Sequence, residues 1–259
     1  LTVSLRGLAD CVVEVATLEQ GLHSGVWGGV VPDALMVLVR LLAGLHDDDG
    51  NVAVAGLYHA TAAEVDRDPG WVRAESGLLD GVQEIGSGSV AQRLWAAPAI
   101  TVIGIDTTPI AKASNTLIPR ARAKISLRVA PGGDAAAHLD ALRRHLEAHV
   151  PWGASVTVTP GDVGQPYAID ATGPIYEAAR AALRQAWGAD AVEMGMGGSI
   201  PFIAEFAATF PDATILVTGV EDPGTMAHSV NESLHLGVLE RAAVAEALLL
   251  DNLGRGHAR

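Results

Sequence analysis

Polar and apolar side chains alternate strictly in a stretch near the middle of the chain, Arg122-Ala123-Lys124-Ile125-Ser126-Leu127-Arg128-Val129. This alternation is the pattern of a β-strand, because successive side chains of a strand point to opposite faces of a sheet. The apolar set would face a core, and the basic set would face solvent or a ligand. The stretch therefore predicts a sheet with one buried face, and it places Arg128 on the polar face of a rigid element.

The segments on either side of this strand complete a recognisable order. The periodicity of a strand or a helix is found, in chain order, in residues 1–17 (strand), 33–45 (helix), 99–106 (strand), 122–129 (strand), 134–150 (helix) and 156–158 (strand). Strand, helix, strand, strand, helix, strand is the order of a ferredoxin-like α+β module. We therefore predict such a module over the first 160 residues or so, interrupted by an insert at about residues 46–97.

After residue 165 the pattern becomes mainly helical. One helix is predicted to begin at Thr172, its N-cap, and to end before Gly188. A second is predicted over residues 237–253, preceded by an apolar run at residues 213–217 that reads as a buried strand. Because this tail supplies too few strands to complete a sheet, we interpret it as the C-terminal part of an α/β domain.

The chain thus divides into two predicted domains, residues 1–165 and 166–259. Its first residues already alternate like the middle of a strand, and no initiator methionine precedes them. We therefore expect the chain to be the back part of a longer protein.

Composition narrows the class of partner. The chain has 259 residues, of which 49% are hydrophobic, and a formal net charge of -13. This charge argues against a nucleic-acid partner, which needs a basic surface. The single cysteine, Cys11, excludes an internal disulfide framework, and no apolar stretch is long enough to span a membrane. We expect a cytoplasmic protein without a membrane or nucleic-acid partner that acts on small molecules or proteins.

Two histidines lie in loops suited to chemistry. His23 is in a segment with four glycines between residues 21 and 29, where a strand gives way to a helix. His228 lies in a polar loop whose neighbours Glu221, Asp222, Asn231 and Glu232 could orient an imidazole.

A glycine-rich loop precedes a predicted helix in the tail. Its sequence is Glu193-Met194-Gly195-Met196-Gly197-Gly198-Ser199. Exposed amides and the Ser199 hydroxyl at a helix start suit an anion such as a carboxylate or an oxyanion. Arg128 could hold a substrate carboxylate by a two-pronged bond.

Four motifs in a fixed order carry a resemblance. They are Leu22-His23-Ser24-Gly25 with Gly28-Gly29; Asn115-Thr116-Leu117-Ile118-Pro119 followed by Ser126-Leu127-Arg128-Val129-Ala130-Pro131; Glu193 with Gly197-Gly198-Ser199-Ile200-Pro201; and Ala227-His228-Ser229-Val230-Asn231-Glu232. In these motifs the chain resembles the zinc metallopeptidase family of aminoacylase, carnosinase and cytosolic dipeptidase, acetylornithine deacetylase and succinyl-diaminopimelate desuccinylase. Thr116 before Leu117-Ile118-Pro119 and the long first domain are similar to the dipeptidase branch.

The resemblance implies a catalytic α/β domain with two zinc ions, for which manganese or cobalt could substitute, and a ferredoxin-like lid that forms a homodimer. His228 would be a metal ligand. His23 would reach the active site of the partner subunit and stabilise the oxyanion of the scissile carbonyl.

The same resemblance assigns the substrate contacts. Arg128, with Asn115 or Thr116, would grip the terminal carboxylate of a small peptide or acyl-amino acid. Gly198 and Ser199 would hold the substrate backbone.

The sequence also departs from the family in one respect. Most metal ligands and the general-base glutamate of the family precede the lid, in a segment that this sequence does not contain. We therefore expect metal-dependent hydrolysis of an amide bond by the complete enzyme and no activity of this chain alone. Two alternatives stay open: an N-acyl-amino-acid deacylase or desuccinylase, and a non-catalytic dimerisation and binding module.

Overall fold

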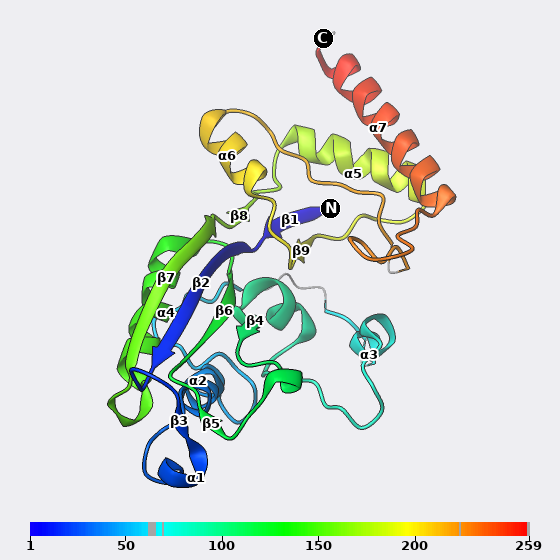
Figure 1. Cartoon of the computed structure of the whole chain (residues 1–259). Helices are drawn as coiled ribbons and strands as arrows, with labels where there is room; N and C mark the ends of the chain where they lie inside the picture. Colours follow the sequence, from blue (N-terminus) through cyan, green and yellow to red (C-terminus); the bar gives the residue numbers. More distant parts are fainter. Residues whose placement is uncertain (62–65, 69, 223, 258–259) are drawn as a thin grey trace.

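The computed structural model describes residues 1–61, 66–68, 70–222 and 224–257. Four antiparallel strands form its main sheet in the order β4-β6-β2-β7. Their bounds are β2 Gly7–Ala16, β4 Ala99–Asp106, β6 Arg120–Val129 and β7 Ser155–Gly164. This is the strand order of a ferredoxin-like sheet, and it confirms the fold that the alternating pattern predicts (Figure 1).

Two helices cover one face of this sheet, α2 (Ala34–Ala43) and α4 (Ala135–His149). Each begins at an aspartate N-cap whose side chain accepts hydrogen bonds from backbone amides of the first turn. The core between helices and sheet contains the fully buried side chains Val13, Val15, Val37, Leu38, Leu41, Ile125, Leu127, Leu142 and Leu146. The apolar residues of the alternating stretch thus face the helices, as predicted.

Long irregular segments surround this layer. The insert between α2 and β4 contains α3 (Trp71–Ser76) and the π-helical turn η1 (Gln92–Ala96). At the far end of the sheet, β3 (Leu22–His23) pairs with β5 (Thr116–Leu117), and the single turn α1 (Ser24–Trp27) follows β3. The remaining short turns are η2 (Ile110–Lys112) and η3 (Pro151–Gly153).

The tail lies at the other end of the sheet (Figure 1). Its helices are α5 (Pro174–Trp187), α6 (Pro201–Thr209) and α7 (Leu236–His257), and its small sheet has the order β8-β1-β9. The strands are β1 (Thr2–Leu5), β8 (Tyr167–Ala168) and β9 (Met194–Met196). Since β1 pairs with both tail strands, the first residues join the tail sheet. The division at residue 165 falls between β7 and β8 and remains our proposal.

Two details of the tail differ from the prediction. Gly173, not Thr172, is the N-cap of α5, because Pro174 occupies the first helical position. The predicted strand at residues 213–217 is not a ladder strand. Val217 forms a single bridge to Thr2, and the next paired residues of β1, Ser4 and Leu5, already have β8 and β9 as their partners.

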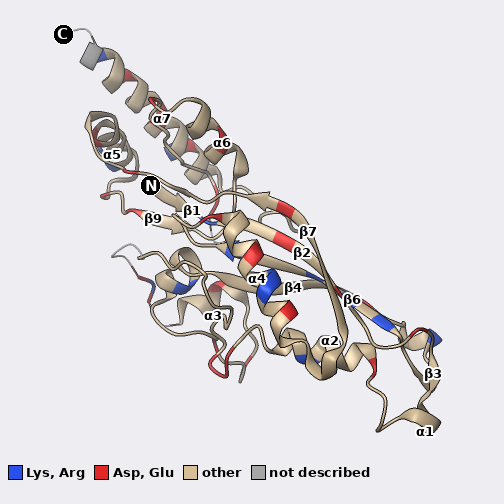
Figure 2. Ribbon diagram, turned by 90° about the vertical axis from the view of Figure 1, so that its left-hand side faces the viewer, with Lys and Arg blue, Asp and Glu red and all other residues tan. Residues whose placement is uncertain are grey.

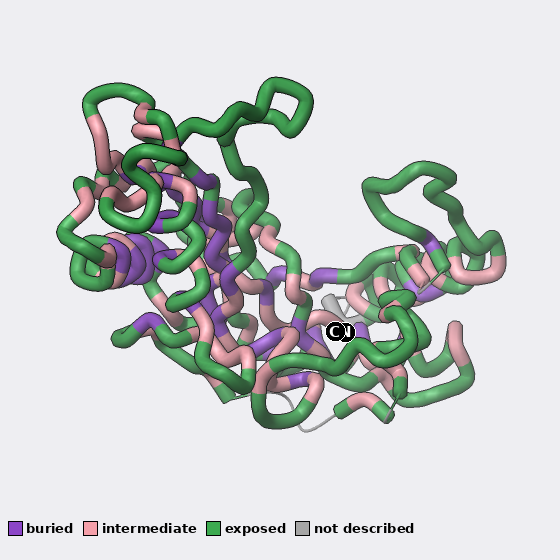
Figure 3. Tube along the Cα trace, turned by 60° about the horizontal axis from the view of Figure 1, so that its bottom comes forward, coloured by how far each residue is buried: buried purple, intermediate pink, exposed green. Residues whose placement is uncertain are grey.

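Burial differs between the two parts. Buried residues concentrate in the four-stranded layer, whereas most of the tail is exposed (Figure 3). The solvent side of α4 carries ion pairs of Arg143 with Asp140 and Glu147 (Figure 2). Within the described ranges, the helices are all too short or too polar to cross a bilayer.

Candidate functional site

Arg128 and Ser199 meet where the main sheet joins the tail. Nη1 of Arg128 donates a hydrogen bond of 2.8 Å to Oγ of Ser199, although 71 residues separate them in the sequence. Arg128 is half-buried near the end of β6, and in the described part of the chain it forms no ion pair with a carboxylate. The structure therefore brings the predicted carboxylate-binding arginine to the glycine-rich loop at residues 193–199, which we call the anion loop.

Arg6, a residue that the sequence analysis did not single out, forms hydrogen bonds with the backbone of the anion loop. Nε of Arg6 donates to the carbonyl oxygen of Gly197 at 3.0 Å, and its backbone N–H donates to that of Met196 at 3.3 Å. Burial, together with nearby Arg128, lowers the pKa of Arg6 to about 10. Two guanidinium groups thus flank one loop, and no local sequence pattern signals this, because the partners lie 191 residues apart.

The other residues of the anion loop have distinct surroundings. Gly198 is exposed, and a Cβ placed on it would come no closer than 4.0 Å to another side chain. Glu193, part of the same motif, pairs with Arg180 of α5.

His23, Asn115 and Thr116 form a second cluster around the β3-β5 pair. His23 lies opposite Thr116 in the ladder, and the Ser24 amide donates to the Asn115 carbonyl at 2.9 Å. Nδ1 of the exposed His23 accepts a hydrogen bond from the Gly25 amide at 3.0 Å. A neutral imidazole that accepts at Nδ1 carries its proton at Nε2, so His23 presents an N–H donor to solvent.

The two clusters lie at opposite ends of β6 (Figure 1). Eight residues separate Arg120 from Arg128, which corresponds to about 26 Å of strand. An Arg128 and a Thr116 or Asn115 of the same chain therefore cannot hold one carboxylate. These groups, and His23, can share a site with Arg128 only when they come from different subunits.

His228 lies in an exposed loop with unusual backbone geometry. It has φ 62°, and its neighbours Met226 and Asn231 have φ 53° and 60°, in the left-handed region that non-glycine residues seldom adopt. The loop is anchored by Thr225, which is 3% exposed and accepts from the Asp222 amide. Glu232 accepts from the backbone N–H of His228 rather than orienting its ring. Strain of this kind is common at functional sites.

The described residues do not make a zinc centre by themselves. No three histidine, cysteine, aspartate or glutamate side chains in the described ranges are grouped so that they could hold a metal ion. A catalytic zinc takes three protein ligands and an open position. His228 fits as one ligand of such a centre, since its ring is exposed on a structured loop.

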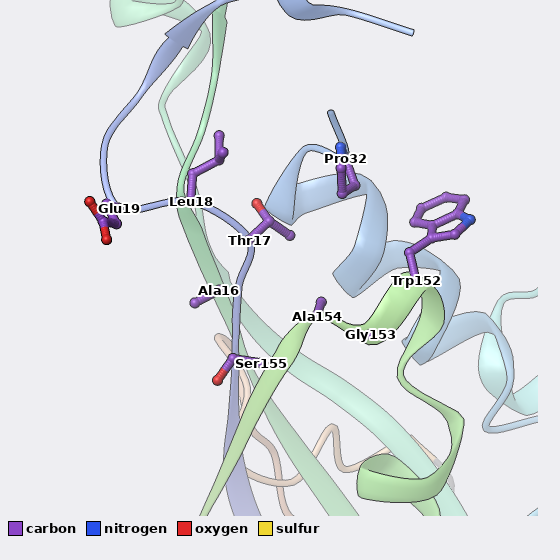
Figure 4. A pocket seen from close by; sticks show the side chains of 9 residues that line it. All are labelled: Ala16, Thr17, Leu18, Glu19, Pro32, Trp152, Gly153, Ala154 and Ser155. Atoms are coloured by element: carbon purple, nitrogen blue, oxygen red, sulfur yellow. The ribbon is translucent and has the colours of Figure 1, made fainter. Parts of the chain in front are cut away.

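An open pocket of about 390 Å³ lies elsewhere, beside the segment that leads to His23 (Figure 4). Its lining includes Thr17, Glu19, Pro32 and Trp152, and it contains none of the predicted site residues. It offers no basic side chain for a carboxylate, so we do not assign the site to it.

Comparison with known proteins relates this geometry to a family. The family model described as peptidase dimerisation domain matches residues 3–154. A cysteinylglycine-S-conjugate dipeptidase of Corynebacterium striatum is 37% identical over 261 residues, which cover 98% of this chain and 57% of that protein. A Beta-Ala-His dipeptidase of Rattus norvegicus is 28% identical over 256 residues, which cover 91% and 50%.

A solved structure agrees with this match. That of the dipeptidase Dug1p from Saccharomyces cerevisiae has a TM-score of 0.79 at 21% identity, covering 97% of this chain and 55% of that chain. The chain spans about half the length of the curated relatives it matches. Because the matched segment is more than half of the chain, this chain belongs to the M20 peptidase family whose dimerisation domain the match describes, as the four motifs predict.

Proposed function

We propose that this chain supplies the lid and the C-terminal part of the catalytic domain of a metal-dependent dipeptidase. The observation that carries the proposal is the hydrogen bond between Arg128 and Ser199, which places an arginine without a carboxylate partner in the described chain beside a glycine-rich loop. A dipeptide ends in a free carboxylate, and a guanidinium binds carboxylates in two-pronged geometry. The names of the relatives, which are dipeptidases, support the same substrate class.

In this proposal, Arg128 and Ser199 bind the terminal carboxylate of the substrate. The exposed Gly198 lies beside them and leaves room for the substrate backbone, since a side chain there would project into open space. Ser199 precedes Ile200, the N-cap of α6, and the unpaired amides at a helix start favour a negative charge.

The partner subunit contributes the second cluster. His23 donates from Nε2 to the carbonyl oxygen of the scissile amide as that oxygen gains negative charge. Asn115 and Thr116 lie next to His23 and help to bind the same substrate from the partner's side. The separation of about 26 Å along β6 supports a site shared between two subunits.

His228 is the metal ligand that this chain offers. Zinc, or manganese or cobalt in its place, supplies a water that is nucleophilic near neutral pH. The remaining ligands and the general base belong to a further part of the catalytic domain. The tail has apolar surface for such a part: Phe202 of α6 and Leu236 and Leu250 of α7 are 66%, 75% and 65% exposed.

Replacing Arg128 by methionine in the full-length protein tests the carboxylate clamp. Loss of a charge-assisted hydrogen bond should lower kcat/KM for a dipeptide by roughly 10- to 100-fold. It should also reduce the preference of the enzyme for a dipeptide over the corresponding dipeptide amide.

Arg122→Met is the matched control. Arg122 lies on the same face of β6 but is exposed and pairs with Asp106 at 2.6 Å, so its loss should leave kcat/KM within about twofold. A wild-type protein that cleaves acyl-amino acids but no dipeptide, or an Arg128→Met variant with unchanged preference, contradicts the proposal.

A further inference from the structure

Arg6 connects three segments that are distant in the sequence. It lies between β1, which belongs to the tail sheet, and β2, which belongs to the main sheet. Its Nε donates to the Gly197 carbonyl at 3.0 Å and its Nη1 to the Ala97 carbonyl at 3.4 Å, where the insert ends and β4 begins. One side chain therefore fixes the anion loop to the lid.

The loop is also shaped to receive this guanidinium. A Cβ on Gly197 would lie 2.9 Å from Nη2 of Arg6 and 3.2 Å from the carbonyl oxygen of Leu94. The first neighbour is tied by two hydrogen bonds and the second is backbone, so neither can move aside easily. Glycine at this position thus lets the loop pack against Arg6.

The charge of Arg6 has no described carboxylate to balance it. Its acceptors are neutral carbonyl groups, and burial, together with the like charge of Arg128, lowers its pKa. Two half-buried positive charges at one loop favour a negative ligand between the lid and the tail.

We propose that Arg6 is a positioning residue for substrate binding: it fixes the Met196–Ser199 backbone so that the Ser199 hydroxyl meets Arg128, and its charge strengthens the attraction of this site for a carboxylate. The proposal rests on the proposed dipeptidase function for its substrate and on the contacts of Arg6 for its mechanism.

Arg6→Lys tests the two hydrogen bonds of the guanidinium group separately from its charge. Lysine keeps a positive charge but cannot donate to both carbonyls in the geometry of a guanidinium. In the full-length protein we expect KM for a dipeptide to rise about tenfold with kcat changed less than about twofold. In the Ser199→Ala background the same substitution should raise KM by less than about threefold, since a residue that acts through Ser199 has little left to position.

A structural measurement on the 259-residue chain accompanies the kinetics. The amide NMR signals of Gly197, Gly198 and Ser199 should shift in Arg6→Lys, while the His23 amide should not. Gly197→Ala should shift the same signals without removing the charge, and it decides the question if Arg6→Lys does not fold. Arg122→Lys is the control for an exposed arginine on the lid.

The outcomes separate the two proposals. Unchanged loop amides, or equal KM effects in Arg6→Lys and Arg122→Lys, overturn the role of Arg6, and so do additive effects with Ser199→Ala. If the wild-type protein cleaves no dipeptide, the proposed function fails, and the amide shifts still decide whether Arg6 positions the loop.

Discussion

Arg128 and His23 are the two residues on which the proposed site depends most. The alternating strand places Arg128 on a polar face, and the structure adds a partner, Ser199, that suits a carboxylate site. The glycine-rich segment places His23 in a loop, and the structure adds a hydrogen bond: Nδ1 accepts from the Gly25 amide, which leaves Nε2 as the donor of the neutral ring.

Cys11 should make stability depend on pH in the alkaline range. Its thiol is fully buried, and burial, with adjacent Asp10, raises the pKa from 9.0 to about 11. Between these values the unfolded chain releases the thiol proton and the folded chain keeps it, so the free energy of unfolding should fall as pH rises from about 9 to about 11. Urea unfolding at several pH values measures this.

Cys11→Ala is the control, because it removes the thiol while other groups still titrate. The wild-type protein should lose more stability than the variant over the same pH range. Parallel pH profiles for the two proteins would show that the thiol titrates normally in the folded state.

In strand β7, the position of Gly161 leaves no room for a side chain. A Cβ on Gly161 would lie 1.9 Å from Oδ1 of Asp10, opposite the irregularity in the β2-β7 register. Asp10 is 6% exposed and is held by Lys124 at 3.1 Å and by the Asp162 amide at 3.3 Å, so it cannot move aside freely. We expect Gly161→Ala to lower the free energy of unfolding by about 1–3 kcal/mol.

The matched substitution is Gly104→Ala in β4. Gly104 is a strand glycine of the same sheet, but a Cβ there would meet nothing within 4 Å. Denaturant unfolding should show a change of less than about 0.5 kcal/mol for Gly104→Ala. Equal losses for the two variants would mean that the contact with Asp10 does not decide the effect.

Periodicity predicted the elements of the lid well and those of the tail less well. The four strands of the main sheet are eight or ten residues long, so the alternation of side chains between the two faces of the sheet extends over several repeats in each. In the tail the strands have two to four residues, and the apolar run at residues 213–217 contributes a single bridge. Arg6 was missed because its partners are set by the packing of the tail on the lid, which no local pattern encodes.

The described part of the chain should bind little zinc. His228 is the one ligand that we propose, and no grouping of three potential ligands exists in the described ranges. Elemental analysis of the purified 259-residue chain after exposure to zinc and gel filtration should therefore give well below one ion per chain. Stoichiometric zinc that survives gel filtration would contradict this, and His228→Ala would then show whether the loop holds the ion.

A dimer matters for the proposed site because, within one chain, the His23 cluster and Arg128 lie at opposite ends of β6. The match to a peptidase dimerisation domain supports a homodimer through the lid. We propose that in this dimer His23 of one subunit approaches Arg128 of the other. A site built from Arg128 of one subunit and His23 of the other is thus the central claim about the complete molecule.

Mixed dimers test this claim most directly. In the full-length protein, Arg128→Met and His23→Ala are each expected to have strongly reduced activity, and each variant keeps the group that the other lacks. When the two variants are dissociated and reassembled together, half of the dimers pair unlike subunits, and each of these contains one site with intact Arg128 and intact His23. We predict recovery of about a quarter of wild-type activity, whereas mixed dimers that stay as inactive as the separate variants would contradict a site shared between subunits.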